Sequence, residues 1–382
     1  MPIGLIHDWL TAMRGGEKVL SALCELLPQA DILTLLHVPG SCDARIERMR
    51  TVTSILNDLP GVRYYYRYLL PLMPLAVERL DATGYDLIIS SSHCVAKGII
   101  SSPSALHVCY CHTPMRYAWA QQKIYWDTMG FSGLTLRAID GYLRAWDLRS
   151  AKHVDYFIAN SHNVARRILQ TYGRHAEVIY PPVDTEFFTP GPEPREDFYL
   201  MVTALVPYKR VDQAIQTFAS LGRPLRIIGS GHHLAKLRRR APKNVSFLGW
   251  RNNEVLRDSY RRCRALVFPG EEDFGMVPVE AMACGTAVIA YGAGGALESV
   301  IDVSQEDYAA PTGLLYAPQT AQALESAVRR FERMEERFQP ERIVAWAQHF
   351  SRARFLQNFK RLVRPLLEKK GLSVPWSNAI TD

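Results

Sequence analysis

Residues 269–285 read PGEEDFGMVPVEAMACG and follow a short apolar run at 265–268. An apolar run that ends in a Pro-Gly loop predicts a buried strand. The small and apolar residues from Val277 onward predict a helix that begins near Gly275. The stretch is therefore a strand, an acidic loop and a helix, which is the repeating unit of a parallel sheet covered by helices.

The same alternation extends to both sides of this unit. In the second half, each strand-like run precedes a helix-like segment. These runs are residues 199–204, 225–228, 245–248, 265–268, 287–290 and 314–316. In the first half, the strand-like runs are residues 3–9, 32–38, 87–91, 106–111 and 156–159. Parallel strands need crossover helices, so the pattern predicts an α/β chain with two Rossmann-like domains in tandem.

Length and composition fit a two-domain globular enzyme. The chain has 382 residues, a net charge of +7 and seven cysteines without a repeated spacing. The charge is spread along both halves, so we expect anionic small molecules or lipid headgroups as partners and no nucleic acid. Free thiols and a start without a leader-like segment predict a cytoplasmic protein. Contact with the inner face of the membrane stays open.

Two carboxylates flank the start of the predicted helix, Glu272 in the loop and Glu280 in the second turn. The free amides of residues 274–276 form a helix N-terminus that can hold a phosphate. Hydroxyls need acceptors and phosphates need donors, so this arrangement suits a sugar nucleotide. The structural alternative is that Glu272 caps the helix and Glu280 pairs with a nearby arginine.

The pair Glu272 and Glu280 resembles the E-x7-E motif of the retaining glycosyltransferases of family 4. Companion motifs follow in the family's order. They are Gly15-Gly16-Glu17, His112-Thr113-Pro114, Asn160-Ser161, Pro181-Pro182-Val183-Asp184, Pro207-Tyr208-Lys209-Arg210, Gly229-Ser230-Gly231 and Gly294-Gly295-x-x-Glu298. The resemblance covers about residues 4–345. It implies the GT-B fold, in which two Rossmann-like domains face each other across a cleft and a C-terminal helix returns to the first domain.

This resemblance also implies three functional parts. Residues 1–180 would bind the acceptor and residues 181–345 the nucleotide-sugar donor, with a proline-rich linker near residue 181. Residues 346–382 would form the helix that packs back on the N-terminal domain. The segment 351–370 has phenylalanines and leucines for one apolar face and no strand after it.

In the family, the first glutamate lies beside the donor sugar, the second binds the ribose and a lysine neutralises the diphosphate. The matching residues are Glu272, Glu280 and Lys209. Many members carry an arginine five positions before this lysine, where this chain has Ala204. Either Arg210 or another arginine replaces that contact, or the contact is missing. The candidate donor-binding residues are Gly15, Gly16, Lys209, Arg210, Gly229, Glu272, Phe274, Gly275, Met276 and Glu280.

His112 follows a predicted strand, at the sheet edge where open α/β folds bind ligands. The resemblance places this histidine close to the reactive sugar, so His112 and Glu272 are the candidate catalytic residues. In a retaining enzyme His112 would orient the sugar, whereas an inverting enzyme would need it as a general base. The segment 111–117 resembles a bacterial polysaccharide and O-antigen subgroup described as mannosyltransferases.

The chain has no D-x-D pair, so no metal ion and no other cofactor are expected. Cys109 and Cys111 share one face of a strand and are interpreted as core residues. The segment with Arg63, Tyr64, Tyr65 and Arg67 suits a contact with the acceptor or with a membrane. Arg116 is a further candidate for this contact. The alternative that stays open for the segment is an ordinary packed helix. Partners are expected to be a nucleotide sugar and a glycan or polyprenyl-diphosphate-linked acceptor.

The predicted function is a retaining, metal-independent hexosyltransferase that moves mannose from GDP-mannose in polysaccharide or O-antigen synthesis. Four alternatives stay open at this stage. A UDP-sugar could be the donor. The chain could be a sugar-nucleotide epimerase or hydrolase of the same plan, or a binder without catalysis. An NAD-type oxidoreductase is disfavoured because the G-x-G-x-x-G fingerprint is absent.

Overall fold

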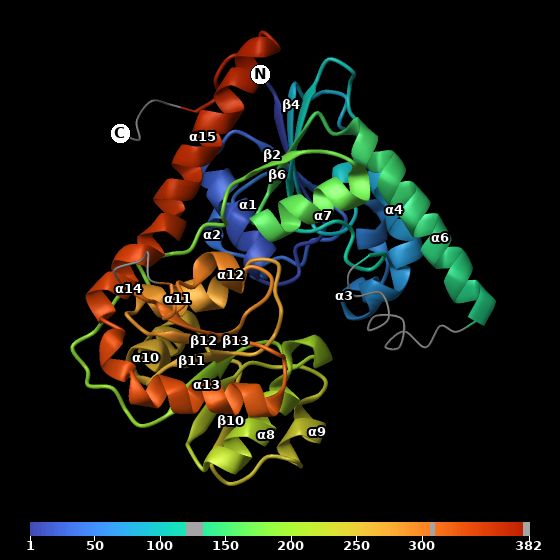
Figure 1. Cartoon of the computed structure of the whole chain (residues 1–382). Helices are drawn as coiled ribbons and strands as arrows, with labels where there is room; N and C mark the ends of the chain where they lie inside the picture. The colour runs from blue at the N-terminus through green and yellow to red at the C-terminus, as the bar shows by residue number, and fades with distance from the viewer. Residues whose placement is uncertain (120–132, 306–309, 377–382) are drawn as a thin grey trace. The chain divides into compact units, whose positions relative to one another are not determined.

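The computed structural model describes residues 1–119, 133–305 and 310–376 (Figure 1). The chain divides into two compact units. The first comprises Met1–Pro182 with Phe355–Asp382, and the second comprises Val183–Arg354. Each unit contains one parallel sheet with helices in its crossovers. This confirms the prediction of two Rossmann-like domains.

The first sheet has seven strands in the order β3-β2-β1-β4-β5-β6-β7, and all neighbours are parallel. The strands are β1 Ile3–His7, β2 Asp31–Thr34, β3 Thr51–Thr53, β4 Leu87–Ser92, β5 Leu106–Cys111, β6 Tyr156–Ala159 and β7 Ala176–Val178. The edge strands β3 and β7 were not predicted, because each has three residues that are not fully buried and form no apolar run. The strand order changes direction between β1 and β4, which defines a topological switch point.

The helices of the first unit cover this sheet or cap its ends. They are α1 Gly15–Leu26, α2 Ala44–Glu47, η1 Ile55–Asp58, α3 Val62–Tyr65, η2 Tyr66–Leu72, α4 Met73–Glu78, η3 Ala96–Gly98, α6 Gly133–Ser150, η4 Ala151–His153 and α7 His162–Tyr172. Residues 66–78 form two elements, the 3-10 turn η2 followed by α4. The prolines explain this break, because Pro71 and Pro74 each lack an amide hydrogen.

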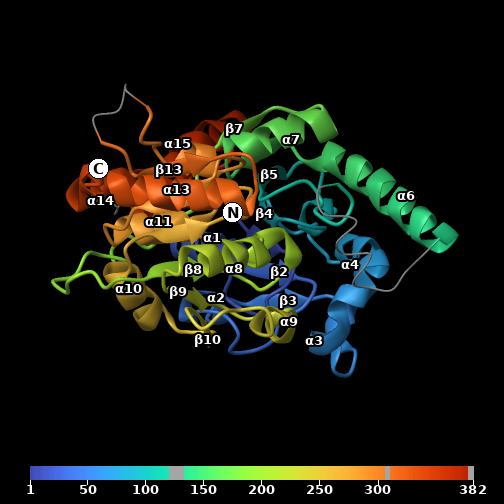
Figure 2. The same ribbon diagram turned by 60° about the horizontal axis from the view of Figure 1, so that its bottom comes forward.

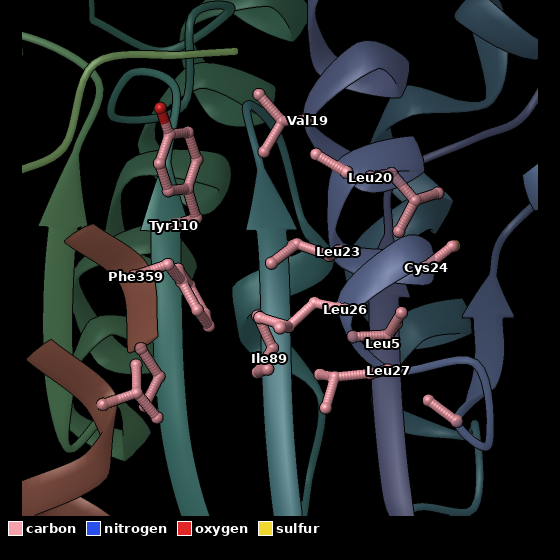
Figure 3. Packing of buried hydrophobic residues seen from close by; sticks show 14 of the residues in the cluster. Leu5, Val19, Leu20, Leu23, Cys24, Leu26, Leu27, Ile89, Tyr110 and Phe359 are labelled. Carbon is pink, nitrogen blue, oxygen red and sulfur yellow. The ribbon is translucent and has the colours of Figure 1, made fainter. Parts of the chain in front are cut away.

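The core of the first unit joins α1, the central strands and the last long helix, α15 (Arg352–Lys369). Figure 3 shows side chains of α1, such as Leu23, facing Leu5 and Ile89 of the sheet. Phe355 and Phe359 of α15 are buried in the same cluster, and the Phe355 ring lies 5.7 Å from that of Tyr110. The C-terminal segment is therefore part of the N-terminal core.

The second sheet has six parallel strands in the order β10-β9-β8-β11-β12-β13. They are β8 Tyr199–Val202, β9 Leu225–Ile228, β10 Val245–Gly249, β11 Leu266–Phe268, β12 Val288–Tyr291 and β13 Gly313–Tyr316. The helices are η5 Pro207–Lys209, α8 Val211–Leu221, α9 Leu234–Arg238, α10 Asn253–Arg262, α11 Met276–Ala283, α12 Ala296–Ser299, α13 Ala321–Arg333, η6 Glu335–Arg337, α14 Pro340–Ala347 and η7 Gln348–Phe350. Helices α8 and α13 lie side by side (Figure 2), and Thr217 donates a hydrogen bond to the Ala321 carbonyl. The switch point lies between β8 and β11.

The structure places the end of the second unit later than the predicted boundary at residue 346. Trp346 donates to the Ser299 carbonyl at 2.8 Å, and the Phe350 ring lies 5.5 Å from Phe274. These contacts hold the residues after α14 in the second unit, so the chain joins the first unit from Phe355. Among the described residues, no helix has both the length and the apolar composition needed to cross a bilayer.

Candidate functional site

In the second unit, two loops meet at the switch point. Lys209 follows β8 and Glu272 follows β11, and these strands are neighbours in the sheet. The loops touch, because a Cβ placed on Gly270 would lie 3.0 Å from the Lys209 Cα. Lys209 and Glu272 form an ion pair, with 15% and 17% of their side chains exposed. Two residues that the sequence places far apart are thus brought together at the edge where such sheets bind ligands.

The N-terminus of α11 lies directly after this pair. Gly275 occupies the N-cap position with φ 85°, a backbone conformation that residues other than glycine rarely adopt. Phe274 before it is 3% exposed, and Met276 is the first residue of the helix. The Gly295 amide donates to the Glu272 carbonyl at 2.9 Å and fixes the loop. This geometry leaves a helix N-terminus beside Lys209, which is a favourable place for a phosphate.

Glu280 lies in α11 and is 3% exposed. The hydroxyl of Tyr260, from α10, donates to its Oε2 at 3.0 Å. Burial, together with the Glu280 carboxylate, raises the pKa of Tyr260 well above its ordinary value, so the phenol keeps its proton. A buried carboxylate thus has a tyrosine as a hydrogen-bond donor, and this contact orients the acid group.

Arg210 has an unusual backbone. Its φ of 56° is the only positive φ at a non-glycine position among the described residues. Its Nε is buried without a hydrogen-bond partner. Gly229, which follows β9, has φ 140° and lies against the Thr203 carbonyl, and Ala204 beside it is exposed. The loop after β8 therefore contacts the residue that follows β9 and also carries the strained Arg210, and such strain is typical of ligand sites.

In the first unit, His112 follows β5 at the carboxyl edge of the sheet. Its Nε2 lies 2.8 Å from Ser91 Oγ, and its carbonyl accepts a hydrogen bond from Asn160 at 3.1 Å. Burial lowers the pKa of His112 well below its ordinary value, and the nearby His93 and His7 lower it further. His112 is therefore neutral at neutral pH.

The loop after β1 reaches the same place. Gly15 and Gly16 are the first residues of α1. A Cβ on Gly16 would lie 3.2 Å from His7 Cε1 and 3.6 Å from His112 Nε2. Glycine is needed here for close approach, so the structure brings the predicted glycines and His112 together.

Asp8 was not predicted as part of this site. It is fully buried and accepts four backbone amides, from residues 93–96, at 2.6 to 3.0 Å. His93 Nδ1 lies 2.8 Å from its Oδ2. Burial opposes ionisation of Asp8, but His93 outweighs it and holds the pKa below its usual range. An acidic residue within an apolar run was the available signal in the sequence, since a buried carboxylate requires donors.

The described part of the chain contains no group of three or more His, Cys, Asp or Glu residues arranged to hold a metal ion. Cys109 and Cys111, predicted as core residues, are 0% and 1% exposed in a hydrophobic cluster with Phe157 and Ile168. Both cysteines are therefore core residues.

Comparison with known proteins identifies the family. A family model described as "Glycosyl transferases group 1" matches residues 183–346, and one described as "Glycosyltransferase Family 4" matches residues 13–187. An uncharacterized glycosyltransferase of Methanocaldococcus jannaschii is 34% identical over 260 residues, which are 65% of this chain and 68% of the relative. The chain belongs to the group 1 glycosyltransferases.

More distant relatives of this group 1 glycosyltransferase agree with that assignment. A D-inositol 3-phosphate glycosyltransferase of a Mycobacterium species is 29% identical over 39% of each chain. Anabaena HepE, solved in complex with UDP, superposes with a TM-score of 0.69 at 17% identity, over 96% of this chain and all of HepE. Sucrose-phosphate synthase of Thermosynechococcus elongatus superposes with a TM-score of 0.70 at 21% identity, over 97% of this chain and all of the synthase. At these identities the two structures show the shared fold alone.

The segment 62–78 of the glycosyltransferase is half core and half surface. Tyr66 and Leu70 are buried, whereas Tyr64 is 75% and Tyr68 54% exposed. The guanidinium of Arg63 stacks on the Tyr64 ring, and the Tyr65 hydroxyl donates to the Pro60 carbonyl. The cationic and aromatic candidates therefore lie together on one short segment. The remaining candidate, Arg116, lies in the loop after β5, and its amide faces the His93 carbonyl at 3.5 Å.

Proposed function

We propose that this glycosyltransferase moves a hexose from a nucleoside diphosphate sugar with retention of the anomeric configuration. The observation that carries the proposal is the Lys209–Glu272 ion pair at the N-terminus of α11. The leaving nucleoside diphosphate gains negative charge in the transition state, and a fixed ammonium group with free amides stabilises that charge. Glu272 would lie beside the donor sugar.

The remaining donor contacts follow from the same geometry. Glu280, oriented by Tyr260, would accept hydrogen bonds from the ribose hydroxyls. Arg210 would supply the phosphate contact that other members obtain from an arginine at the position of Ala204. Because Lys209, Arg210 and the amides can neutralise the diphosphate, we propose that transfer needs no metal ion. His112 would orient the hexose rather than act as a base, because in retention the departing phosphate can take the acceptor proton.

For the donor we propose GDP-mannose, on the resemblance of residues 111–117 to mannosyltransferases of polysaccharide and O-antigen synthesis. A UDP-sugar is the second candidate, because Anabaena HepE was solved with UDP and with UDP-glucose. A thermal-shift panel of GDP-mannose, UDP-glucose, UDP-galactose and UDP-N-acetylglucosamine distinguishes them. The true donor should give the largest rise in melting temperature.

The reaction is tested by following nucleoside diphosphate release and identifying the sugar product. Transfer or slow hydrolysis releases the nucleoside diphosphate, and an NAD-type oxidoreductase or a non-catalytic binder does not. An epimerase is recognised by a changed sugar. With an acceptor, NMR of the glycoside should show an α-linkage from an α-linked donor. A β-linked product would refute retention and make His112 the leading candidate for a general base.

For the acceptor we propose a lipid-linked glycan at the inner membrane face. The side chains of Ile55, Tyr64, Tyr68 and Leu72 are all exposed and come from one stretch of chain, which also carries Arg63 and Arg67. Aromatic and cationic side chains bind the interface of anionic bilayers.

Vesicle sedimentation tests this surface. The protein should bind vesicles that contain phosphatidylglycerol more strongly than phosphatidylcholine vesicles. Combining Tyr64→Ser and Tyr68→Ser should reduce binding. The matched control is Tyr142→Ser on α6, which also changes a partly exposed tyrosine. Equal binding by the double variant and the control would refute the membrane contact.

A further inference from the structure

A hydrogen-bonded chain crosses three neighbouring strands of the first sheet. His7 ends β1, Ser91 lies in β4 and His112 follows β5. Ser91 Oγ lies 3.1 Å from His7 Nδ1 and 2.8 Å from His112 Nε2. Parallel pairing sets His7 directly beside Ser91, and both residues are fully buried. The sheet itself therefore holds the three side chains in line.

A serine hydroxyl has one hydrogen, so Ser91 donates to one of the two imidazoles and accepts from the other. If it donates to His7, His112 must carry its hydrogen on Nε2. If it donates to His112, the hydrogen of the neutral His112 ring must lie on Nδ1. The positions of the hydrogens on the two histidines are thus coupled through Ser91.

Glu17 determines which arrangement is favoured. Its Oε1 lies 3.9 Å from His7 Nε2, which is a charge contact longer than a hydrogen bond, and its Oε2 accepts the Arg14 amide at 3.0 Å. A carboxylate that faces Nε2 favours a hydrogen on that nitrogen. When Nε2 carries the single ring hydrogen of His7, Nδ1 accepts from Ser91, and Ser91 then accepts from His112.

We propose that Glu17, His7 and Ser91 are positioning residues that hold His112 as the Nε2–H tautomer, so that its Nδ1 accepts a hydrogen bond from a hydroxyl of the transferred sugar. The inference rests on the proposed role of His112 at the donor sugar. The hydrogen bond that the structure gives the His112 side chain is the one between Nε2 and Ser91, on the opposite nitrogen from Nδ1. Gly16 lies against the same histidines, because a Cβ there would be in tight contact with the His7 ring at 3.2 Å and in ordinary contact with His112 at 3.6 Å.

Other charged groups near His112 do not replace this chain. Asp8 binds His93 and the amides of residues 93–96, so its two oxygens are already occupied. His93 and Arg116 both disfavour a positive charge on His112 and so help to keep the ring neutral. Only a neutral ring has a single hydrogen that can lie on either nitrogen. Ser91 remains the group that touches Nε2.

The test reads the tautomer directly, by nitrogen NMR of protein labelled with 15N-histidine at neutral pH. The His112 signals are assigned by their loss in His112→Gln. The wild type should show hydrogen on Nε2, and Ser91→Ala should give a mixture of tautomers. In the same variant kcat should fall at least about tenfold, while the Kd of the nucleoside diphosphate stays unchanged.

Two further comparisons separate positioning from packing. The matched control is Ser90→Ala, because Ser90 is equally buried in β4 and bonds a different histidine, His107, at 2.8 Å. This control should leave kcat and the His112 tautomer unchanged. At position 7, His7→Asn can still accept from Ser91 and should retain more activity than His7→Phe.

Two results would overturn the inference: a wild-type His112 with its hydrogen on Nδ1, or a Ser91→Ala variant with unchanged tautomer and kcat. Absence of transfer from every nucleotide sugar would instead refute the proposed function. Measuring the His112 tautomer on that same protein would still decide whether the hydrogen bonds through His7 and Ser91 fix the position of its hydrogen.

Discussion

Replacing Arg210 with glycine should raise stability and lower nucleotide affinity at the same time. Arg210 has φ 56° and ψ 36°, a left-handed conformation that costs about 1–2 kcal/mol with a side chain and almost nothing with glycine. Glycine also makes the unfolded chain more flexible, which offsets about 0.4–1 kcal/mol. The net expectation is a gain of up to about 1.6 kcal/mol. In a domain of this size the melting temperature should rise by no more than about 6 °C.

The affinity should change in the opposite direction. The Nε of Arg210 is buried without a hydrogen-bond partner, so removing the guanidinium breaks no hydrogen bond of that nitrogen. If the guanidinium binds the diphosphate, its loss costs about 1.5–3 kcal/mol. That loss corresponds to a roughly 10- to 100-fold higher Kd for the nucleoside diphosphate, measurable by titration calorimetry.

Two variants control this experiment. Arg210→Lys keeps the charge and the strain, so it should bind more tightly than Arg210→Gly without the rise in melting temperature. Adding Ala204→Arg to Arg210→Gly should recover part of the affinity, because Ala204 is exposed on the loop that follows β8. Unchanged affinity in Arg210→Gly would refute the phosphate contact. A lower melting temperature would refute the argument from strain.

Four further outcomes are expected. Activity should survive EDTA nearly unchanged; a loss that Mg²⁺ or Mn²⁺ restores would contradict leaving-group stabilisation by Lys209. Glu280→Gln should weaken binding of the nucleoside diphosphate, measured by calorimetry, because ribose contacts persist in the product; an unchanged Kd would reject the ribose role. Phe359→Ala removes a fully buried ring and should cost about 3–5 kcal/mol in denaturant unfolding, and a much smaller cost would mean that the α15 contact is loose. Because the pKa of Asp8 is lowered in the folded state, its carboxylate stabilises the fold at neutral pH. This contribution is lost as the pH falls below 3.8, the ordinary pKa of an aspartate, towards the lower folded-state pKa. Asp8→Asn should therefore lower stability at pH 7 and flatten its dependence on acidic pH, and parallel curves would contradict this.

The sequence predicted those elements of the fold whose apolar runs are long enough to be read. Strand β5 has the bounds predicted for it, 106–111, because all six of its residues are buried in one run. The edge strands β3 and β7 were missed because half-exposed strands of three residues carry no periodic signal.

The candidate site was predictable only in part, and the reason lies in strand order. Lys209, Glu272 and His112 each follow a predicted strand, so their position at a sheet edge could be inferred from the sequence. Periodicity does not reveal which strands are neighbours. The order places β8 beside β11 and β1 beside β4, and only then do Lys209 and Glu272 meet, or His7 and Ser91.

The same argument explains why the chemistry collects where it does. In open α/β sheets of this kind, ligands bind outside the carboxyl ends of the strands, at the switch point where the strand order reverses. In the second unit this edge carries the ion pair and the α11 N-terminus, which suit a diphosphate. In the first unit the corresponding edge carries the neutral His112 and its positioning chain, which suit a hydroxyl. One topology, used twice with different side chains, thus places an ion pair at the switch point of one sheet and a neutral imidazole at the switch point of the other.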